Sequence, residues 1–225
     1  MSTAARREPE RLPIVVLISG RGSNLKAIID AIGNDALPVE IRAVVTDRPR
    51  AAGLRHARAA GIPIEAVEAA DFPDRERFDL ALAERIDRHA PRLVVLAGFM
   101  RILSPRFVAH YAGRLINIHP SLLPAFKGLD THRRALHAGV REHGASVHLV
   151  TEELDGGPVV LQVAVPVRAD DTPETLAARV LRQEHRLYPS AIRWFAEGRL
   201  AWNQGRVWLD GAPLAAPARL PAAPD

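Results

Sequence analysis

The feature that most constrains the fold of this chain is a series of short apolar runs separated by segments with a helical repeat. The runs cover residues 14–18, 41–46, 92–98 and 115–119. Continuous apolar runs of this length are typical of strands that are buried on both faces, as in parallel sheets. Amphipathic helical patterns lie between or beside them, at residues 25–32, 51–60, 75–90 and 105–111. The alternation predicts an α/β fold with a doubly wound, mostly parallel sheet.

The pattern changes after about residue 144. Apolar runs at 145–150 and 158–165 flank Asp155, Gly156 and Gly157, which are typical of a hairpin turn, so we expect an antiparallel addition to the sheet. A long helix is predicted to start at Thr172 and to end at about residue 187, because Pro189 removes a backbone donor. Residues 13–210 are therefore expected to form one domain. The ends, 1–12 and the Ala- and Pro-rich 212–225, are expected to be poorly ordered.

The composition excludes several kinds of chemistry. The 225 residues include no cysteine, which removes disulfides, thiol nucleophiles and thiolate metal sites. Nine histidines are present, but none has a metal-ligand spacing, so we expect no metal. The net charge is +4, yet the basic residues form no cluster interleaved with aromatic residues, which argues against a nucleic-acid partner. The early apolar run is too short for a signal peptide or a membrane span. We therefore expect a cytoplasmic protein that acts on small molecules, as a monomer or a homodimer.

Two polar side chains mark the end of the fourth apolar run. Asn117 and His119 are two residues apart, so in a strand they share one face, while Ile116 and Ile118 share the other. Pro120 cannot continue a ladder of hydrogen bonds, so the strand ends there. Ligands of doubly wound sheets bind at the carboxyl ends of the strands. A pair of polar groups on one face at such an end indicates a functional site.

Three other features allow both a functional and a structural interpretation. The turn from Gly20 to Asn24 joins a strand to a helix and could hold a phosphate, but a tight turn with a helix cap is equally compatible. Asp155 suits a hairpin turn by itself; close to His119, its carboxylate would favour the charged imidazolium. Glu184 interrupts the apolar stripe of the long helix, either as part of an internal Arg–Glu pair, or as a residue at the edge of the stripe, or as a ligand contact.

Four segments together resemble the phosphoribosylglycinamide formyltransferase family. They are Ser-Gly-Arg-Gly-Ser-Asn at 19–24, Gly-Phe-Met-Arg-Ile-Leu at 98–103, Asn-Ile-His-Pro-Ser-Leu-Leu-Pro at 117–124 and Leu-Asp-Gly-Gly-Pro-Val at 154–159. The resemblance extends over about residues 13–210. It implies a Rossmann-like formyltransferase fold and formyl transfer from the co-substrate 10-formyltetrahydrofolate to the amine of glycinamide ribonucleotide, a step of purine (IMP) biosynthesis that needs no metal.

The resemblance also implies roles for individual residues. The catalytic residues would be Asn117, His119 and Asp155. The substrate phosphate and ribose would be bound by Gly22, Ser23, Asn24 and Glu184. The folate would be bound by Arg75, Met100, Arg101, Ile102, Leu103 and Asn117, with Arg75 at the glutamate tail. Leu181 stands where some relatives have a polar residue, so the ribose contacts are expected to differ in detail.

Three alternatives remain open. Hydrolysis of 10-formyltetrahydrofolate would call for an additional N-terminal regulatory domain, and formylation of methionyl-tRNA for a basic C-terminal domain of about a hundred residues. A binding protein without turnover could keep the phosphate turn and lose one of Asn117, His119 and Asp155. All three are present, which favours an enzyme.

Overall fold

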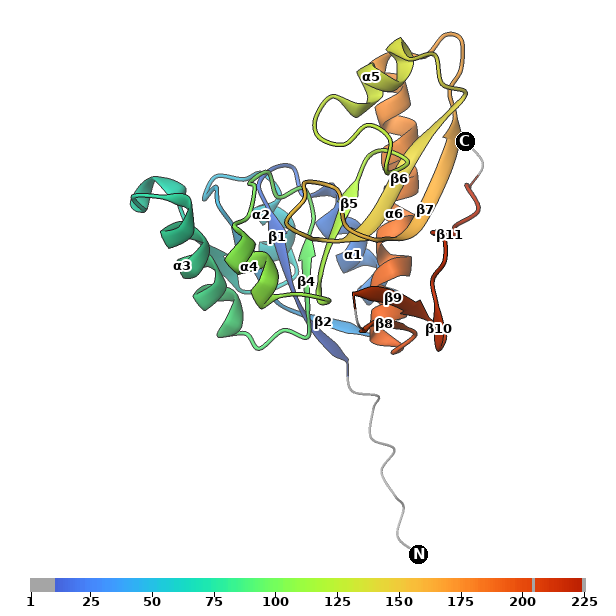
Figure 1. The fold of residues 1–225 in the computed structure, drawn as a ribbon. Coiled ribbons are helices and arrows are strands. Elements are labelled where there is room, and N and C mark those ends of the chain that lie inside the picture. Colours follow the sequence, from blue (N-terminus) through green and yellow to red (C-terminus); the bar gives the residue numbers. More distant parts are fainter. Residues whose placement is uncertain (1–10, 204, 224–225) are drawn as a thin grey trace, which may run out of the picture.

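A central sheet organises the part of the chain that the computed structural model describes, residues 11–203 and 205–223 (Figure 1). Its strands, in their order across the sheet, are β11 (Ala218–Arg219), β7 (Val159–Pro166), β6 (Glu142–Leu149), β5 (Leu115–His119), β4 (Leu93–Leu96), β1 (Leu12–Ile18), β2 (Val39–Thr46) and β3 (Ile64–Ala66). From β3 to β5 every neighbouring pair is parallel. The predicted doubly wound, mostly parallel sheet is confirmed, and β3 lies at its edge, where Pro63 costs no ladder bond.

Helices cover both faces of the sheet, as Figure 1 shows. The helices are α1 (Ser23–Gly33), α2 (Leu54–Ala59), α3 (Arg75–Asp87), α4 (Pro105–His110), α5 (Thr131–His137) and α6 (Pro173–Ala196), with a short 3₁₀ helix η1 (Ala69–Asp71). Side chains alternate along β1, so Ile14 and Val16 belong to the core under α1, α2 and α6, and Val15 and Leu17 to the core under α3 and α4. This is why the run 14–18 is apolar throughout.

The strand order reverses at β1, which lies between β2 and β4. At the carboxyl ends of β1 and β4 the two following loops contact each other. The Ser19 N–H donates to the Gly98 carbonyl at 3.1 Å, and the Met100 N–H donates to the Ser19 hydroxyl at 2.9 Å. These hydrogen bonds place the turn that could hold a phosphate beside the segment 98–103. Both lie at the reversal of strand order, which is where doubly wound sheets bind ligands.

The antiparallel hairpin expected after residue 144 is present. β6 pairs antiparallel with both β5 and β7, and the β6–β7 register shifts between Val147 and His148. A bulge of this kind changes the direction of a side chain and is frequent beside active sites. The hairpin therefore extends the parallel sheet beyond β5, the strand that carries Asn117 and His119.

Helix α6 is longer than the sequence predicts. It starts as expected, with Thr172 as its N-cap and Pro173 in its first turn, but it continues through Pro189 to Ala196. A proline inside a helix costs about 3 kcal/mol. Fully buried residues on both sides of it, among them Tyr188, Ala191 and Ile192, offset that cost by tertiary packing. Although α6 has 24 residues, no helix in the described part of the chain is apolar enough to cross a membrane.

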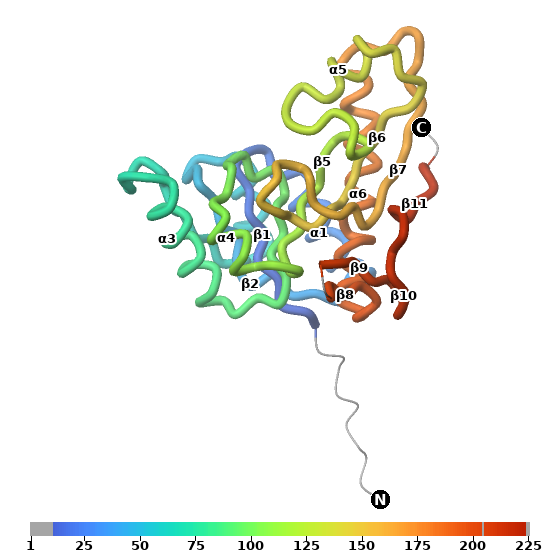
Figure 2. Tube along the Cα trace, in the orientation of Figure 1, coloured from blue at the N-terminus to red at the C-terminus, as the bar shows by residue number. Residues whose placement is uncertain are grey.

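The C-terminal segment differs from the expected poorly ordered tail. A small antiparallel sheet consists of β8 (Leu200–Asn203), β9 (Arg206–Leu209) and β10 (Ala212–Pro213). The chain then runs along β7, with which β11 pairs in parallel, as the red end of the tube in Figure 2 shows. The Gln183 side chain exchanges two hydrogen bonds of 3.1 Å with the backbone of Ala223. These partners order a segment whose composition alone predicts little structure. The prediction for residues 1–10 lies outside the described residues.

Candidate active site

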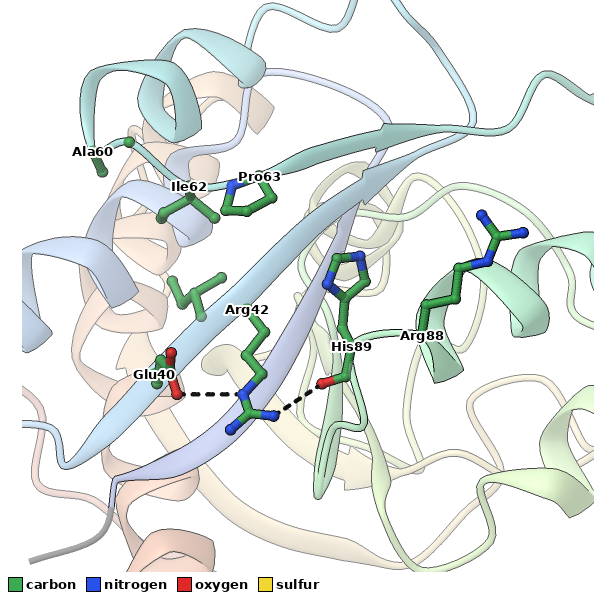
Figure 3. A pocket seen from close by; sticks show the side chains of 9 residues that line it. Glu40, Arg42, Ala60, Ile62, Pro63, Arg88 and His89 are labelled. Atoms are coloured by element: carbon green, nitrogen blue, oxygen red, sulfur yellow. Dashed lines mark hydrogen bonds and ion pairs between the residues drawn. The ribbon is translucent and has the colours of Figure 1, made fainter.

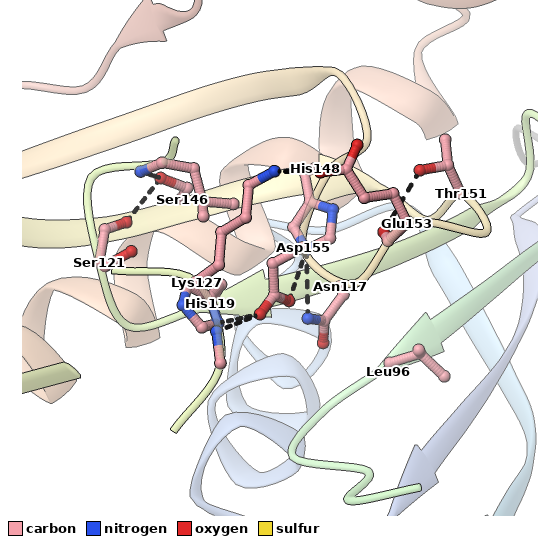
Figure 4. Close-up of polar contacts among 12 residues, drawn as sticks. Leu96, Asn117, His119, Ser121, Lys127, Ser146, His148, Thr151, Glu153 and Asp155 are labelled. Atoms are coloured by element: carbon pink, nitrogen blue, oxygen red, sulfur yellow. Dashed lines mark hydrogen bonds and ion pairs between the residues drawn. The ribbon is translucent and has the colours of Figure 1, made fainter. Parts of the chain in front are cut away.

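The candidate site is built on the end of β5. Ile116 and Ile118 belong to the core under α1 and α6, so Asn117 and His119 emerge on the opposite face, as the strand period predicts. The loops after β5 and after β6 meet on this face, where Figure 4 shows the polar side chains converging. The sheet thus holds the two side chains, and the loops supply their partners.

His119 is held between two oxygen atoms. Its Nδ1 lies 3.4 Å from Asp155 Oδ2, as Figure 4 shows. Its Nε2 donates to the Phe126 carbonyl at 3.0 Å. The side chain is only 7% exposed. A carbonyl and a carboxylate both accept hydrogen bonds, so the arrangement suits an imidazolium with a proton on each nitrogen. The Phe126 carbonyl oxygen accepts the hydrogen bond of Nε2, and a substrate oxygen in the same position could accept that bond in its place.

Asp155 reaches His119 through the geometry of its turn. Its backbone has a φ of 49°, in the left-handed region that Asp tolerates better than most residues. The Gly128 N–H donates to Asp155 Oδ2 at 2.9 Å, which ties the two loops together. A Cβ on Gly157 would lie 1.9 Å from the Leu149 carbonyl oxygen, so only glycine fits there. Asp155 therefore both suits the backbone conformation of the turn and lies close to His119.

The structure adds polar residues that the sequence analysis did not single out. Ser146 and His148 lie directly across the β5–β6 pair from His119 and Asn117. Ser146 accepts from Gln162 at 2.8 Å and donates to the Ser121 carbonyl at 2.7 Å. The spacing of Ser146 and His148 within an apolar strand carries the same period-two signal as Asn117 and His119 and could have revealed them.

The turn from Gly20 to Asn24 has the geometry of an anion site. Gly22 has a φ of 69° and precedes the first residue of α1, and its Cβ would lie 2.7 Å from the Gly53 Cα. The first N–H groups of a helix have no partner within it and favour negative charge. The side chain of Asn24 turns inward and donates to Glu184 Oε2 at 2.8 Å.

Glu184 is therefore partnered by Asn24 rather than by an arginine. It is 8% exposed, and burial raises the pKa of its carboxyl, while the hydrogen bond from Asn24 acts in the opposite direction. Among the residues that the structure describes, none is a hydrogen-bond partner of the buried Asn24 Oδ1. The structure thus brings Gly22, Ser23, Asn24 and Glu184 together, although 160 positions separate Asn24 from Glu184.

The segment 100–103 forms an apolar rim beside this turn. Met100 and Ile102 are 58% and 59% exposed, so two large apolar side chains lie at the surface of this segment. The Arg101 guanidinium lies 4.6 Å from the centre of the Phe78 ring in α3. Arg75 is the first residue of that helix, one turn before Phe78, and is exposed. It lies near the segment, but no described contact joins it to the other site residues.

Two cavities lie at different ends of the sheet. One, of about 260 Å³, includes Asp155 and Lys127 and is bordered by the C-terminal segment 214–217. The other, of about 500 Å³, is shown in Figure 3 and is lined by residues including Arg42, Arg88 and His89. It lies at the amino-terminal ends of β2 and β3, away from Asn117 and His119, so its larger volume does not identify the candidate active site. Among the described residues, no group of three or more His, Asp or Glu side chains could hold a metal ion.

Comparison with known proteins defines the class to which this fold and site belong. The family model for formyl transferase matches residues 12–192. This match, which covers most of the chain, identifies a formyl transferase.

Individual relatives indicate which family of formyl transferases the chain belongs to. The phosphoribosylglycinamide formyltransferase of Escherichia coli is 57% identical over 201 residues, which cover 89% of this chain and 95% of the relative. The structure of the Coxiella burnetii phosphoribosylglycinamide formyltransferase is 52% identical, with a TM-score of 0.91, over 94% of this chain and all of that one. A formyltetrahydrofolate deformylase from Pseudomonas syringae is 28% identical, with a TM-score of 0.82, over 88% of this chain and 66% of that one. The chain belongs to the phosphoribosylglycinamide formyltransferase family.

Proposed function

We propose that this chain transfers the formyl group of 10-formyltetrahydrofolate to the amine of glycinamide ribonucleotide by means of Asn117, His119 and Asp155. The products are formylglycinamide ribonucleotide and tetrahydrofolate, and the reaction belongs to purine biosynthesis. Family membership supports the reaction. The observation that supports the roles is the contact of 3.4 Å between His119 Nδ1 and Asp155 Oδ2, beside Asn117 at the end of β5.

The chemistry requires stabilisation of a developing oxyanion. Attack of the amine nitrogen on the formyl carbon forms a C–N bond and moves an electron pair onto the formyl oxygen. An Asn117 amide N–H and a protonated His119 are suitable donors to that oxygen, and one such donor contributes about 10²–10³-fold in rate. The Phe126 carbonyl oxygen, 3.0 Å from His119 Nε2, indicates where the formyl oxygen would lie.

Collapse of the tetrahedral species breaks the bond between the formyl carbon and the folate nitrogen. The electron pair of that bond goes to the folate nitrogen, which takes up a proton, and the former amine loses one. We assign this proton transfer, from the former amine to the folate nitrogen, to His119, with Asp155 holding the imidazole ring in its orientation. The buried position of both side chains, 7% and 8% exposed, protects this exchange from bulk water.

The other residues bind the two substrates. We propose that the backbone at Gly22, Ser23 and Asn24 binds the ribonucleotide phosphate and that Glu184 contacts its ribose, as the hydrogen bond of 2.8 Å between Asn24 and Glu184 suggests. The exposed apolar rim at 100–103 would bind the folate together with Asn117, and Arg75 its glutamate tail. Residues 13–210 would act as one formyltransferase domain. We place the protein in the cytoplasm, acting on small molecules as a monomer or homodimer.

The decisive experiment measures tetrahydrofolate release from purified protein. Release is expected only when both glycinamide ribonucleotide and 10-formyltetrahydrofolate are supplied. Release without the ribonucleotide would identify a hydrolase, and no release would identify a binding protein. In the same assay, His119→Ala is expected to lose about 10²-fold or more in turnover while the variant remains folded.

A histidine outside the site provides the matched control. His110 in α4 is 46% exposed and pairs with Asp87 at 2.8 Å. His110→Ala should retain turnover within about twofold, because surface pairs of this kind contribute little even to stability. Near-normal turnover in His119→Ala would refute the role assigned to that residue.

A further inference from the structure

His148 lies opposite Asn117 in the antiparallel pair of β5 and β6. It sits at the bulge between β6 and β7, and it is 2% exposed. Its Nε2 is 3.2 Å from Asn117 Nδ2, and its Nδ1 is 2.9 Å from the Leu149 carbonyl oxygen. We propose that His148 is a positioning residue for formyl transfer: by accepting a hydrogen bond, it fixes the orientation of the Asn117 amide. This inference rests on the proposed function.

The contacts of His148 define its tautomer. A carbonyl oxygen can only accept, so Nδ1 carries the proton that is shared with Leu149. Burial lowers the pKa of His148, which leaves the ring neutral and Nε2 with a free electron pair. The charged groups that face the ring are Asp155, His119 and Lys127. Asp155 Oδ1 is 3.7 Å from Nε2, beyond hydrogen-bond length, so it does not replace Asn117 as the partner.

The tautomer in turn determines how Asn117 is oriented. An unprotonated Nε2 requires a donor, so the amide must present its NH₂ group, and the opposite orientation would place two acceptors against each other. The amide is planar, so one bond fixes both its oxygen and its second N–H. That second N–H is the donor assigned to the formyl oxygen. Without His148 the amide could rotate, and the donor would be correctly placed only part of the time.

The test uses two replacements that differ in the ability to accept a hydrogen bond. His148→Phe keeps a planar ring but offers no acceptor, and His148→Gln offers an amide oxygen. His148→Phe is expected to lower kcat by about 10- to 100-fold, less than complete loss of an oxyanion donor, with KM for both substrates within about threefold. His148→Gln should recover most of kcat. A merely structural role would not separate kcat from KM in this way.

A double-mutant cycle with Asn117→Ala tests whether the effect passes through Asn117. Once Asn117 is absent, His148→Phe should lower kcat by less than about twofold more. Independent effects that multiply would overturn the inference, as would near-normal kcat in His148→Phe, or a His148→Gln variant as slow as a folded His148→Phe. If the wild type itself transfers no formyl group, the proposed function fails rather than this assignment.

A measurement on the unaltered protein covers the case in which a variant does not fold. The ¹⁵N shifts of the His148 ring at neutral pH should show a protonated Nδ1 and an unprotonated Nε2. A protonated Nε2 would overturn the assignment, because that nitrogen could then not accept from Asn117.

Discussion

The buried ion pair between Arg179 and Asp171 permits the most quantitative prediction. The guanidinium makes two bonds to the carboxylate, of 2.6 and 2.8 Å, and a third of 3.0 Å to the Pro166 carbonyl. The two side chains are 6% and 2% exposed. Arg179 thereby joins α6 both to the loop that precedes the helix, through Asp171, and to the end of β7, through Pro166. We therefore expect Arg179→Met to destabilise the whole domain rather than one loop.

The magnitude follows from what Asp171 would keep. Removing one partner of a buried pair costs about 3–5 kcal/mol. Asp171 would still accept from the Arg168 N–H at 2.8 Å and from the Thr175 hydroxyl at 2.9 Å, so we expect the lower end, about 3 kcal/mol. For a domain of this size, that loss lowers Tm by about 6–12 °C.

The effect has a defined pH dependence. The Arg179 guanidinium holds the pKa of Asp171 well below its usual 3.8. A depressed pKa in the folded state contributes stability above the unfolded value and loses it as the pH falls through the folded value. Thermal unfolding at a series of pH values should therefore show a constant gap between wild type and Arg179→Met near neutrality, and a smaller gap below about pH 4.

Arg199 provides the control, because it makes a similar two-bond pair with Asp210 at 2.7 and 2.8 Å but is 40% exposed. Arg199→Met should lower Tm far less than Arg179→Met does, because an exposed ion pair contributes little to stability. Equal losses in the two variants, or a gap for Arg179→Met that does not change with pH, would refute the argument from burial.

Two further substitutions test the packing around the site. Tyr188→Phe removes a buried hydroxyl that donates to the Leu96 carbonyl at 2.8 Å, and should cost about 1–2 kcal/mol in denaturant unfolding without changing KM; an unchanged midpoint would contradict this. Gly144→Ala would place a Cβ 2.0 Å from the Val163 carbonyl oxygen, and should cost about 1–3 kcal/mol or more. Gly33→Ala, with open space around it, should be neutral or slightly stabilising, and the same loss in both alanine variants would rule out the steric explanation.

Local sequence patterns were sufficient to predict the sheet and the shared direction of two site residues, Asn117 and His119. Burial on both faces requires an apolar run whatever the neighbours are, so β1, β2, β4 and β5 could be predicted from sequence. The period of two placed Asn117 and His119 on one face before any partner was known. The positions of the hairpin and of the start of α6 also followed from turn and capping residues, which act over a few positions.

Local patterns were insufficient where distant segments determine the energy. Pro189 ends a helix in isolation, yet α6 continues because buried neighbours on both sides offset the lost hydrogen bond. Residues 212–223 are ordered by the pairing of β11 with β7 and by the contacts of Ala223 with Gln183, which their composition does not encode. Propensity describes a segment by itself, whereas packing depends on what surrounds it.

The sequence by itself determined the strand–helix order, the common direction of Asn117 and His119, and the motifs that resemble the formyltransferases. Only the tertiary structure decided the distance of 3.4 Å from His119 to Asp155, the pairing of Asn24 with Glu184, and the place of His148 against Asn117. The physical reason is that side-chain direction follows from the local backbone period, while contact between residues far apart in the chain depends on how the loops and strands pack.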